Sequence, residues 1–529
     1  MELLFLVCRE GSDLKEYLMP PYKESVKSYV VGTRIEQDDK SVAEELREKV
    51  EVHCLLLVRN HYEELKASHI ARSWGGRCNH LHIEKTGKDG YELRTYLKIY
   101  ERHSHSLHWL LHVHVDSYVI VENLRYMVAG LAPTKPLCFH AEHAPYPYAH
   151  VGLHKSRDLL LSHGALKALV QTQICMDIAF VMDCLELSGI EGFNHTVESY
   201  PVILPYVRAN QVHVLDFFLY HLRVYGYVNY QPALPTSAEF HVKALPSNNF
   251  LGKQLYGKVR IFCLVLTFPL QYGKVVKAIR NTWARHCNKL LFFSSRTQRI
   301  YSNQTIALNV TEGYDILWSK TKAAFKYVYE HHWHEADWFY KADDDTFAII
   351  SNMRYMLHNY RPDAPIYFGC NFNRYLKQGY MSGGAGYVLS REALRRFALW
   401  GLSSSNCTSS YPSEDYGMGS CLSYCNVTAG DSRDTQGRLR FFPLQIENFL
   451  ITANRNKEFW IWDFMNYFPE FQGIDCCSSY AISIHYTEYY QMYVFDYLIF
   501  KERPYGIRNV HVPLPGLGTI QRNSSSDII

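Results

Sequence analysis

The sequence predicts an α/β protein made of two tandem units of the same fold, each a Rossmann-like sandwich of helices around a mainly parallel sheet. Two observations support this expectation. Apolar runs of strand length alternate with runs of helical length, and the order of motifs in the first half of the chain returns in the second half. A chain of 529 residues with 47% hydrophobic content is also long enough to bury more than one core.

The alternation is clearest in the second half of the chain. We expect strands at 259–266, 290–294, 338–342 and 365–369, and helices at 274–285, 316–331, 351–357 and 391–399. Ligands of such a sheet bind at the carboxyl ends of the strands. Polar residues that directly follow a predicted strand are therefore candidates for a functional site.

An internal repeat divides the chain. Cys54 and Cys78 recur as Cys263 and Cys287 at the same spacing, with a tryptophan four residues before the second cysteine in each copy. Residues 109–127 align in the same way with 338–356, and 215–226 with 495–506. The expected organisation is a lead-in at 1–48 with a helix over 41–49, a first unit at 49–230, a linker at 231–249, a second unit at 250–510 and a disordered tail at 511–529.

Three adjacent carboxylates, Asp343, Asp344 and Asp345, follow the apolar run at 338–342. Hard oxygen ligands select ions such as magnesium or manganese, and such an ion neutralises the charge that builds on a departing phosphate. The triplet therefore indicates transfer of a group from a nucleotide-activated donor. Taken alone, it is equally compatible with a solvated acidic loop.

Two further motifs lie downstream. Glycines at Gly383, Gly384 and 386 precede an apolar run, which lets the backbone pass close to a bulky ligand, although a tight turn explains them too. Glu414 and Asp415 follow Ser413 at an expected helix start, where Ser413 is placed to cap the helix. A carboxylate at this position is either a general base or a charge that stabilises the helix terminus.

Eight blocks between about 245 and 510 carry a family resemblance. In order they are FCLVLTFP, KAIRNTWARHCNKLLFFSS, EADWFYKADDDT, PIYFG, KQGYMSGGAGYVLSREALRRF, SEDYGMGSC, AGDSRDT and CCSSYAISIHY. Together they resemble the core 1 β1,3-galactosyltransferases (T-synthases) of glycosyltransferase family 31. The resemblance implies a GT-A fold and transfer of galactose from UDP-galactose to a GalNAc-bearing glycoprotein or peptide. It also implies a manganese(2+) cofactor, location in the Golgi lumen, and a homodimer or a dedicated chaperone as partner.

The resemblance also implies roles for individual residues. Asp415 matches the catalytic base, with Glu414 as its substitute, and Asp343, Asp345 and His485 match the manganese ligands, while Asp344 orients its neighbours or meets the nucleotide. The positions that match UDP-binding residues are Thr267, Glu312, Gly313, Tyr314, Lys320 and Tyr493. Tyr314 stands where the family motif EGRD has arginine, which predicts weaker donor binding or an altered donor. Gly383, Gly384 and Trp460 match acceptor-side positions, although a tryptophan is more often simply buried.

The first unit lacks most of this polar set. His114 and Val115 occupy the positions of Asp343 and Asp344, and Asp116 alone keeps its acid. Residues 155–158 replace the glycine run, Asp177-Ile178 replaces Glu414-Asp415, and 445–490 has no counterpart, so we expect a catalytically silent copy. His112, His114 and Asp116 alternate, so on a strand their side chains face the same side. They form either a zinc site that replaces the lost one, or surface and half-buried histidines without a catalytic role.

Composition limits the remaining function classes. A formal charge of +3 without a basic run argues against nucleic-acid binding. Fourteen cysteines without paired zinc-finger spacing favour disulfides formed in an oxidising lumen. The apolar stretch at 1–8 is far shorter than the roughly 20 residues of a membrane span, so we expect the natural protein to begin upstream and to be a type II membrane protein. A non-catalytic, chaperone-like protein and a transferase for another UDP-sugar remain alternatives.

Overall fold

A computed structural model describes residues 38–85, 92–142, 157–171, 190–194, 202–204, 207–227, 231, 249–297, 303–408, 411, 413–451, 460–467 and 473–509. Most of the predicted lead-in, nearly all of the linker, the tail, and Asp177-Ile178 lie outside these residues. In the described part of the chain, no helix is long and apolar enough to cross a membrane. The helix expected over 41–49 is confirmed as α1 (Ser41–Lys49).

The second unit is built on a seven-stranded sheet. Its strands, in spatial order, are β11 (Thr305–Ala307), β10 (Lys289–Ser294), β9 (Ile261–Leu266), β12 (Trp338–Asp343), β17 (Tyr387–Ser390), β14 (Ile366–Gly369) and β18 (Thr428–Ala429). The first four are parallel, β17 runs antiparallel to both neighbours, and β18 is parallel to β14. All four strands expected in this half are present, and the sheet is mainly parallel as predicted.

Helices cover both faces of this sheet because its strands are apolar on both sides. On β9, Phe262 and Leu264 enter one core, while Cys263 and Val265 enter the other. The first core is closed by α10 (Leu317–His332), α12 (Arg391–Arg396) and α14 (Glu414–Tyr424), and the second by α9 (Lys277–Asn281), α11 (Ile350–Leu357) and α17 (Tyr489–Phe500). Further helices of this unit are α8 (Phe250–Lys258), α13 (Ser405–Thr408), α15 (Glu447–Leu450) and α16 (Ile461–Phe464). The expected α/β/α sandwich is confirmed.

One predicted helix is interrupted. The run at 274–285 forms a π-turn over Tyr272–Val276, then α9, and then a 3₁₀ turn over Trp283–His286, with a break at Thr282. The Thr282 hydroxyl donates a hydrogen bond to the carbonyl of Ala278, and the next side chain, Trp283, is fully buried. Burial of this tryptophan and the Cys263–Cys287 disulfide turn the chain back toward β9, which an uninterrupted helix would prevent.

The first unit contains a six-stranded sheet with the same strand order and directions as β10-β9-β12-β17-β14-β18. Its strands, in spatial order, are β2 (His80–Lys85), β1 (Val52–Val58), β3 (Trp109–His112), β6 (Arg157–Ser162), β5 (Leu137–Glu142) and β7 (Glu191–Asn194). Within the described residues, its helices are α1, α2 (His61–Ala71), α3 (Glu92–His103), α4 (Val121–Val128), α5 (His163–Gln171) and α7 (Ala209–Asp216). The Cys54–Cys78 and Cys263–Cys287 disulfides both span 6.1 Å between Cα atoms and occupy matching places. These matches support the predicted duplication.

The two units exchange their carboxy-terminal segments. Asn352 of the second unit donates to the carbonyl of Arg223 at 2.8 Å and accepts from the Tyr225 amide at 3.0 Å. Reciprocally, Asn123 of the first unit donates to Glu502 at 3.0 Å and accepts from the Tyr505 amide at 2.9 Å. Two stacked tyrosine pairs repeat the pattern: Tyr126 on Tyr505, and Tyr225 on Tyr355.

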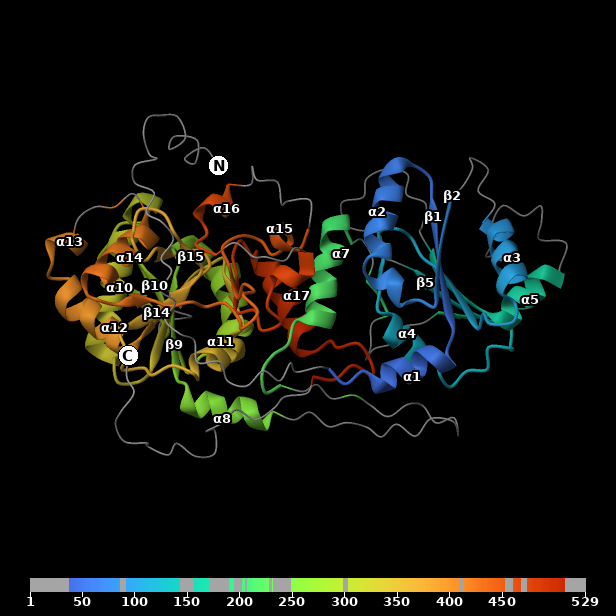
Figure 1. Cartoon of the computed structure of the whole chain (residues 1–529), viewed down its shortest axis with the longest axis horizontal. Coiled ribbons are helices and arrows are strands. Elements are labelled where there is room, and N and C mark those ends of the chain that lie inside the picture. The colour runs from blue at the N-terminus through green and yellow to red at the C-terminus, as the bar shows by residue number, and fades with distance from the viewer. Residues whose placement is uncertain are drawn as a thin grey trace.

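The exchange gives the chain an internal pseudo-two-fold relation of the kind found in self-complementary dimers. Figure 1 shows α7 and α17 lying between the two sheets, where Phe218 and Phe495 contact each other with ring centroids 4.5 Å apart. The buried Arg503 also donates to the carbonyls of Leu219 and Leu222. The first unit is therefore part of the packing of the second, not an independent appendage.

Candidate active site

The acidic triplet lies at the carboxyl end of β12, as the sequence predicts. Asp343 is the last residue of the strand, and a tight turn leads into β13 (Phe347–Ala348). β13 pairs with β20 (Ser483–Ile484), which places the following residue, His485, beside the triplet. The Nε2 atom of His485 lies 3.3 Å from Oδ1 of Asp345. Two segments far apart in the sequence thus meet through a small sheet that also contains β19 (Phe441–Phe442).

Asp343, Asp345 and His485 fit a divalent cation. One ligand atom from each lies within 4.8 Å of the others. The Nδ1 atom of His485 is 2.9 Å from the carbonyl oxygen of Pro443, so it donates there and leaves the Nε2 lone pair facing Asp345. Burial disfavours the imidazolium, but the Asp345 carboxylate outweighs it and raises the pKa of His485. Two carboxylates and an imidazole form a donor set that suits manganese.

A buried lysine, which the sequence-based reasoning missed, lies beneath the triplet. Lys341 on β12 is 2% exposed and contacts Oδ1 of Asp343 at 2.7 Å and Oε2 of Glu414 at 3.3 Å. Burial opposes its charge, yet these two carboxylates raise the pKa of Lys341. The signal was a lysine inside an otherwise apolar strand, since a buried charge needs a paired partner.

Glu414 and Asp415 have different surroundings at the start of α14. Glu414 is buried and accepts hydrogen bonds from the Tyr387 hydroxyl at 2.5 Å and from Lys341. Asp415 is half-buried and accepts from the Gly383 amide at 3.2 Å through Oδ2. Glu414 is therefore committed to internal partners, whereas Asp415 is the more accessible carboxylate. Ser413 occupies the N-cap position but makes no side-chain cap bond, so the expected capping role is wrong.

The glycine run is required, although for a different reason from the one expected. A Cβ atom on Gly383 would lie 2.8 Å from Oε2 of Glu414, and one on Gly384 would lie 2.1 Å from Cε1 of His485. The backbone therefore passes close to the side chains of the site itself. The Gly384 carbonyl also accepts from the Thr346 hydroxyl at 2.8 Å, which fixes the loop to the turn that carries the triplet.

Four of the residues matched to UDP binding form one connected group. The Thr267 hydroxyl donates to Asp344 at 2.7 Å, and the Thr267 carbonyl accepts from Lys320. Lys320 in turn pairs with Glu312 at 2.6 Å. Desolvation, together with the neighbouring carboxylates, raises the pKa of Asp344 to about 7. The group lies beside the proposed metal ligands because Asp344 stands between Asp343 and Asp345 in the chain.

The other matched positions are less tightly integrated. Tyr314, next to Gly313 in the chain, is 73% exposed. Trp460 is 40% exposed, and its ring contacts Phe464. Tyr493 lies on α17, where its hydroxyl bonds Asn281 at 3.4 Å and its ring lines a cavity between the two units. These contacts place Tyr493 at the unit boundary and do not join it to the connected group.

The corresponding end of the first unit is built differently. The side chain of Asp116 pairs with Lys66, and the His114 amide donates to Asp158 at 3.0 Å. Asp158 stands where the second unit has a glycine, Gly386, and it is buried. The two alternatives left open for His112, His114 and Asp116 are thereby separated: these described residues do not gather as metal ligands, because His112 is hydrogen-bonded to the Tyr96 hydroxyl at 2.7 Å and Asp116 pairs with Lys66.

Comparisons with known proteins identify the family. A Fringe-like family model matches residues 259–432. The chain is 43% identical over 277 residues to the glycoprotein-N-acetylgalactosamine 3-beta-galactosyltransferase 1 of Xenopus laevis, which covers 52% of this chain and 75% of that protein. It is 28% identical over 174 residues to the beta-1,3-glucosyltransferase of Mus musculus, covering 32% of this chain and 34% of that protein.

Among solved structures, a glycosyltransferase involved in the glycosylation of the major capsid of PBCV-1 is similar to 28% of this chain and 84% of its own, at 14% identity and a TM-score of 0.20. The match to the Xenopus protein is of a different order, because it combines high identity with most of that protein's length. The chain therefore belongs to the family of glycoprotein-N-acetylgalactosamine 3-beta-galactosyltransferases.

Proposed function

We propose that the second unit transfers galactose from UDP-galactose to the 3-hydroxyl of GalNAc linked to Ser or Thr of a glycoprotein, with inversion at the sugar carbon. The observation that carries this proposal is that Asp343, Asp345 and His485 come together next to the Thr267–Asp344 pair. The glycine run joins Asp415 to this group, because the Gly383 amide bonds Asp415 and Gly384 packs against His485. The Xenopus relative, named as a galactosyltransferase acting on glycoprotein N-acetylgalactosamine, supports the choice of donor sugar and acceptor. Manganese dependence, the Golgi lumen, and a homodimer or chaperone partner belong to the same proposal.

Asp415 acts as the general base in this mechanism. A sugar hydroxyl is a poor nucleophile until a base within hydrogen-bond reach takes its proton as the new bond forms. The amides of Gly383 and Tyr416 donate to the two oxygens of Asp415, at 3.2 and 2.9 Å, and so hold the carboxylate in one orientation. Because the reaction inverts, this base faces the side of the galactose opposite the departing UDP.

The remaining polar groups serve the donor. Manganese, held by Asp343, Asp345 and His485, would supply positive charge to the diphosphate of the departing UDP. Lys341 sets the orientation of Asp343 from below at 2.7 Å. Thr267 and Lys320 fix Asp344 and Glu312 on the nucleotide side. The site residues are thus held by contacts within the protein, which lowers the cost of ordering them during the reaction.

The test compares two matched substitutions in a transfer assay with UDP-galactose and a GalNAc-peptide, with and without manganese. Asp345→Ala removes a ligand of the proposed ion, and we expect transfer to fall by about 10³-fold or more. Asp116→Ala makes the same change at the corresponding position of the first unit, and we expect transfer to stay within about twofold of the unaltered protein.

Equal transfer by the Asp345→Ala protein would contradict the metal assignment. Absence of transfer by the unaltered protein with manganese present, combined with tight association with a related transferase, would favour the chaperone-like alternative. Parallel assays with other UDP-sugars decide the donor, which the exposed Tyr314 leaves open.

A further inference from the structure

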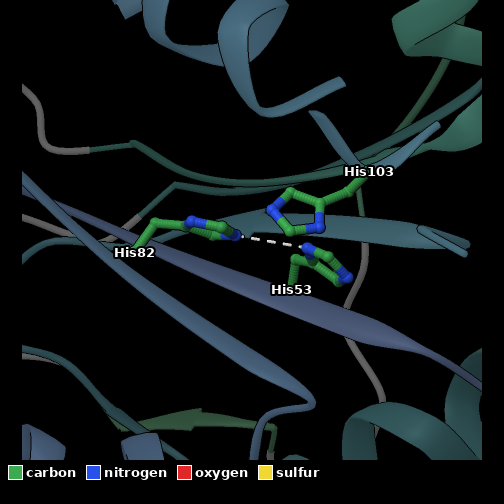
Figure 2. A group of neighbouring side chains, drawn as sticks. All are labelled: His53, His82 and His103. Atoms are coloured by element: carbon green, nitrogen blue, oxygen red, sulfur yellow. Dashed lines mark hydrogen bonds between the residues drawn. The ribbon is translucent and has the colours of Figure 1, made fainter. Parts of the chain in front are cut away.

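A group of histidines lies at the opposite end of the first unit from the position that corresponds to the active site. His53 is near the start of β1, His80 and His82 are near the start of β2, and His103 is the last residue of α3. Figure 2 shows the rings of His53, His82 and His103 turned toward one another. The group belongs to the amino ends of the parallel strands, so it is separate from the site that transfers the sugar.

The ring nitrogens are spaced as ligands of one metal ion. Nδ1 of His53 lies 3.2 Å from Nε2 of His82, and one ring nitrogen from each of His53, His82 and His103 lies within 4.8 Å of the others. Two nitrogens bound to a tetrahedral zinc ion at about 2.0–2.1 Å are roughly 3.3 Å apart. The separation between His53 and His82 already matches this value.

A carboxylate orients the central histidine. Nε2 of His53, which is fully buried, lies 3.2 Å from Oε1 of Glu51 and donates to it. This bond leaves the Nδ1 lone pair directed at His82, which is the arrangement of carboxylate, histidine and metal seen in many zinc sites.

The second unit shows that the fold does not require histidine at these places. The strand register aligns His53 with Phe262 and His82 with Leu291, and both of these residues are buried in an apolar core. The residue that corresponds to His103 is His332, whose ring contacts Phe262. Thus two apolar core residues are replaced, in the first unit only, by two side chains that face a third histidine. Replacing buried apolar groups by polar ones is costly unless the polar groups gain partners.

We propose that His53, His82 and His103 bind a zinc ion in the first unit. Three imidazoles suit zinc among the common biological cations, whereas magnesium, calcium and manganese prefer oxygen ligands. His82 and His103 are only partly buried, so the ion has a route from solvent and a fourth position left for water. His80, whose side chain is 48% exposed, lies at the rim and is not one of the three ligands. The inference stands independently of the galactosyl transfer proposed above.

The experiment measures zinc bound per chain, by elemental analysis after zinc loading and gel filtration of the full-length protein. His82→Leu introduces the residue found at the matching position of the second unit, so the fold has a precedent for it. We expect this variant to bind one zinc ion fewer per chain than the unaltered protein. His61→Leu is the matched control, because the side chain of His61 is 96% exposed, and it should bind as much zinc as the unaltered protein.

Two further measurements keep the assignment falsifiable. Zinc should raise the melting temperature of the unaltered protein and of His80→Gln by a few degrees. The rise should be smaller in His82→Leu, because that variant lacks this site. His103→Gln tests the third ligand and replaces His82→Leu if the leucine variant fails to fold. Any zinc held by the second unit is common to all these proteins and cancels in the comparison. Equal zinc content in the unaltered and His82→Leu proteins, or loss of zinc in His80→Gln, would overturn the proposal.

Discussion

The two units share a framework and differ at both ends of the central strands. At the carboxyl ends, the second unit gathers Asp343, Asp345 and His485, whereas the first unit keeps a single acid of the triplet, Asp116, and pairs it with Lys66. The strand order, the strand directions and the paired disulfide are the same in both. The sheet and its disulfide are therefore compatible with different side chains at the strand ends, and those side chains change without altering the sheet.

At the amino ends the relation is reversed. The second unit packs Phe262 and Leu291 into an apolar core, whereas the first unit has His53 and His82 there. The first unit thus lacks the acidic cluster at the carboxyl ends of its strands and has a histidine cluster at their amino ends. The fold tolerates both because each cluster occupies side-chain positions on strands whose backbone hydrogen bonds are unchanged.

The largest change in activity is expected from substitutions of the two carboxylates at the start of α14, Glu414 and Asp415. We expect Asp415→Asn to lower kcat by about 10²–10⁴-fold, as expected when a general base is removed, with little change in the KM for UDP-galactose. Glu414→Gln should lower kcat by about tenfold or less, because Glu414 is buried against Tyr387 and Lys341 and has no free route to the acceptor. Steady-state kinetics on both variants measure the difference.

Thermal unfolding separates the two roles further. Glu414→Gln leaves the buried Lys341 with Asp343 as its one anionic partner, and we expect a loss of about 1–3 kcal/mol in the free energy of unfolding. Asp415→Asn, at a half-buried position, should change stability by less than about 1 kcal/mol. If Glu414→Gln abolished transfer while Asp415→Asn remained active, the base would have to be reassigned to Glu414.

The next effect concerns the exchanged segments that hold the units together. Asn352→Ala removes two donated bonds, to the carbonyls of Arg223 and Ala481, and one accepted from the Tyr225 amide, at a side chain that is itself fully buried. Unpartnered buried backbone groups are expensive, so we expect a loss of about 2–4 kcal/mol in the free energy of unfolding. Urea denaturation followed by far-UV circular dichroism measures it.

Asn123→Ala is the matched variant on the other side of the exchange. It removes the bond donated to Glu502 and the bond accepted from the Tyr505 amide, and we expect a loss of about 1–3 kcal/mol in the free energy of unfolding. If both exchanged segments stabilise the association of the units, both variants should lose free energy of unfolding. An unchanged unfolding midpoint for Asn123→Ala would show that only the Asn352 side stabilises the association.

Much of the fold could be predicted from the chain itself. The runs that became β9, β12 and α10 were bounded within two residues, because continuous apolar stretches and helical spacing are local signals. The break at Thr282 was missed, because it depends on where Trp283 is buried. Local patterns report the type of an element far better than the tertiary contacts that interrupt it.

The candidate site was predicted only in part. The acidic triplet is a local motif that is visible in the sequence. The position of His485 is not, because the pairing of β13 with β20 is what brings it to Asp345, and its role was inferred from the family resemblance. The same limit applies to His53 and His82, which become neighbours through the register of β1 with β2. A cluster assembled by strand pairing leaves no spacing signal in the sequence, whereas the alternation of His112 and His114 is visible there.

The smallest effect tests the one position where the second unit departs from the family motif. Tyr314 follows Glu312-Gly313 and stands where the EGRD motif has arginine. Glu312 pairs with Lys320 at 2.6 Å, and Tyr314, two positions later in the chain, is 73% exposed. Tyr314→Arg would place a cation near the diphosphate, and we expect the KM for UDP-galactose to fall by about three- to tenfold with kcat nearly unchanged, in line with a partly exposed ion pair of roughly 1 kcal/mol. Because salt screens such a pair, the decrease in KM should become smaller as the sodium chloride concentration is raised.

Tyr314→Phe is the control, and it should leave the KM for UDP-galactose within about twofold of the unaltered value. A Tyr314→Arg protein with an unchanged KM at low salt would place the diphosphate away from this loop, and the group formed by Thr267, Asp344 and Lys320 would then have to bind the donor without it.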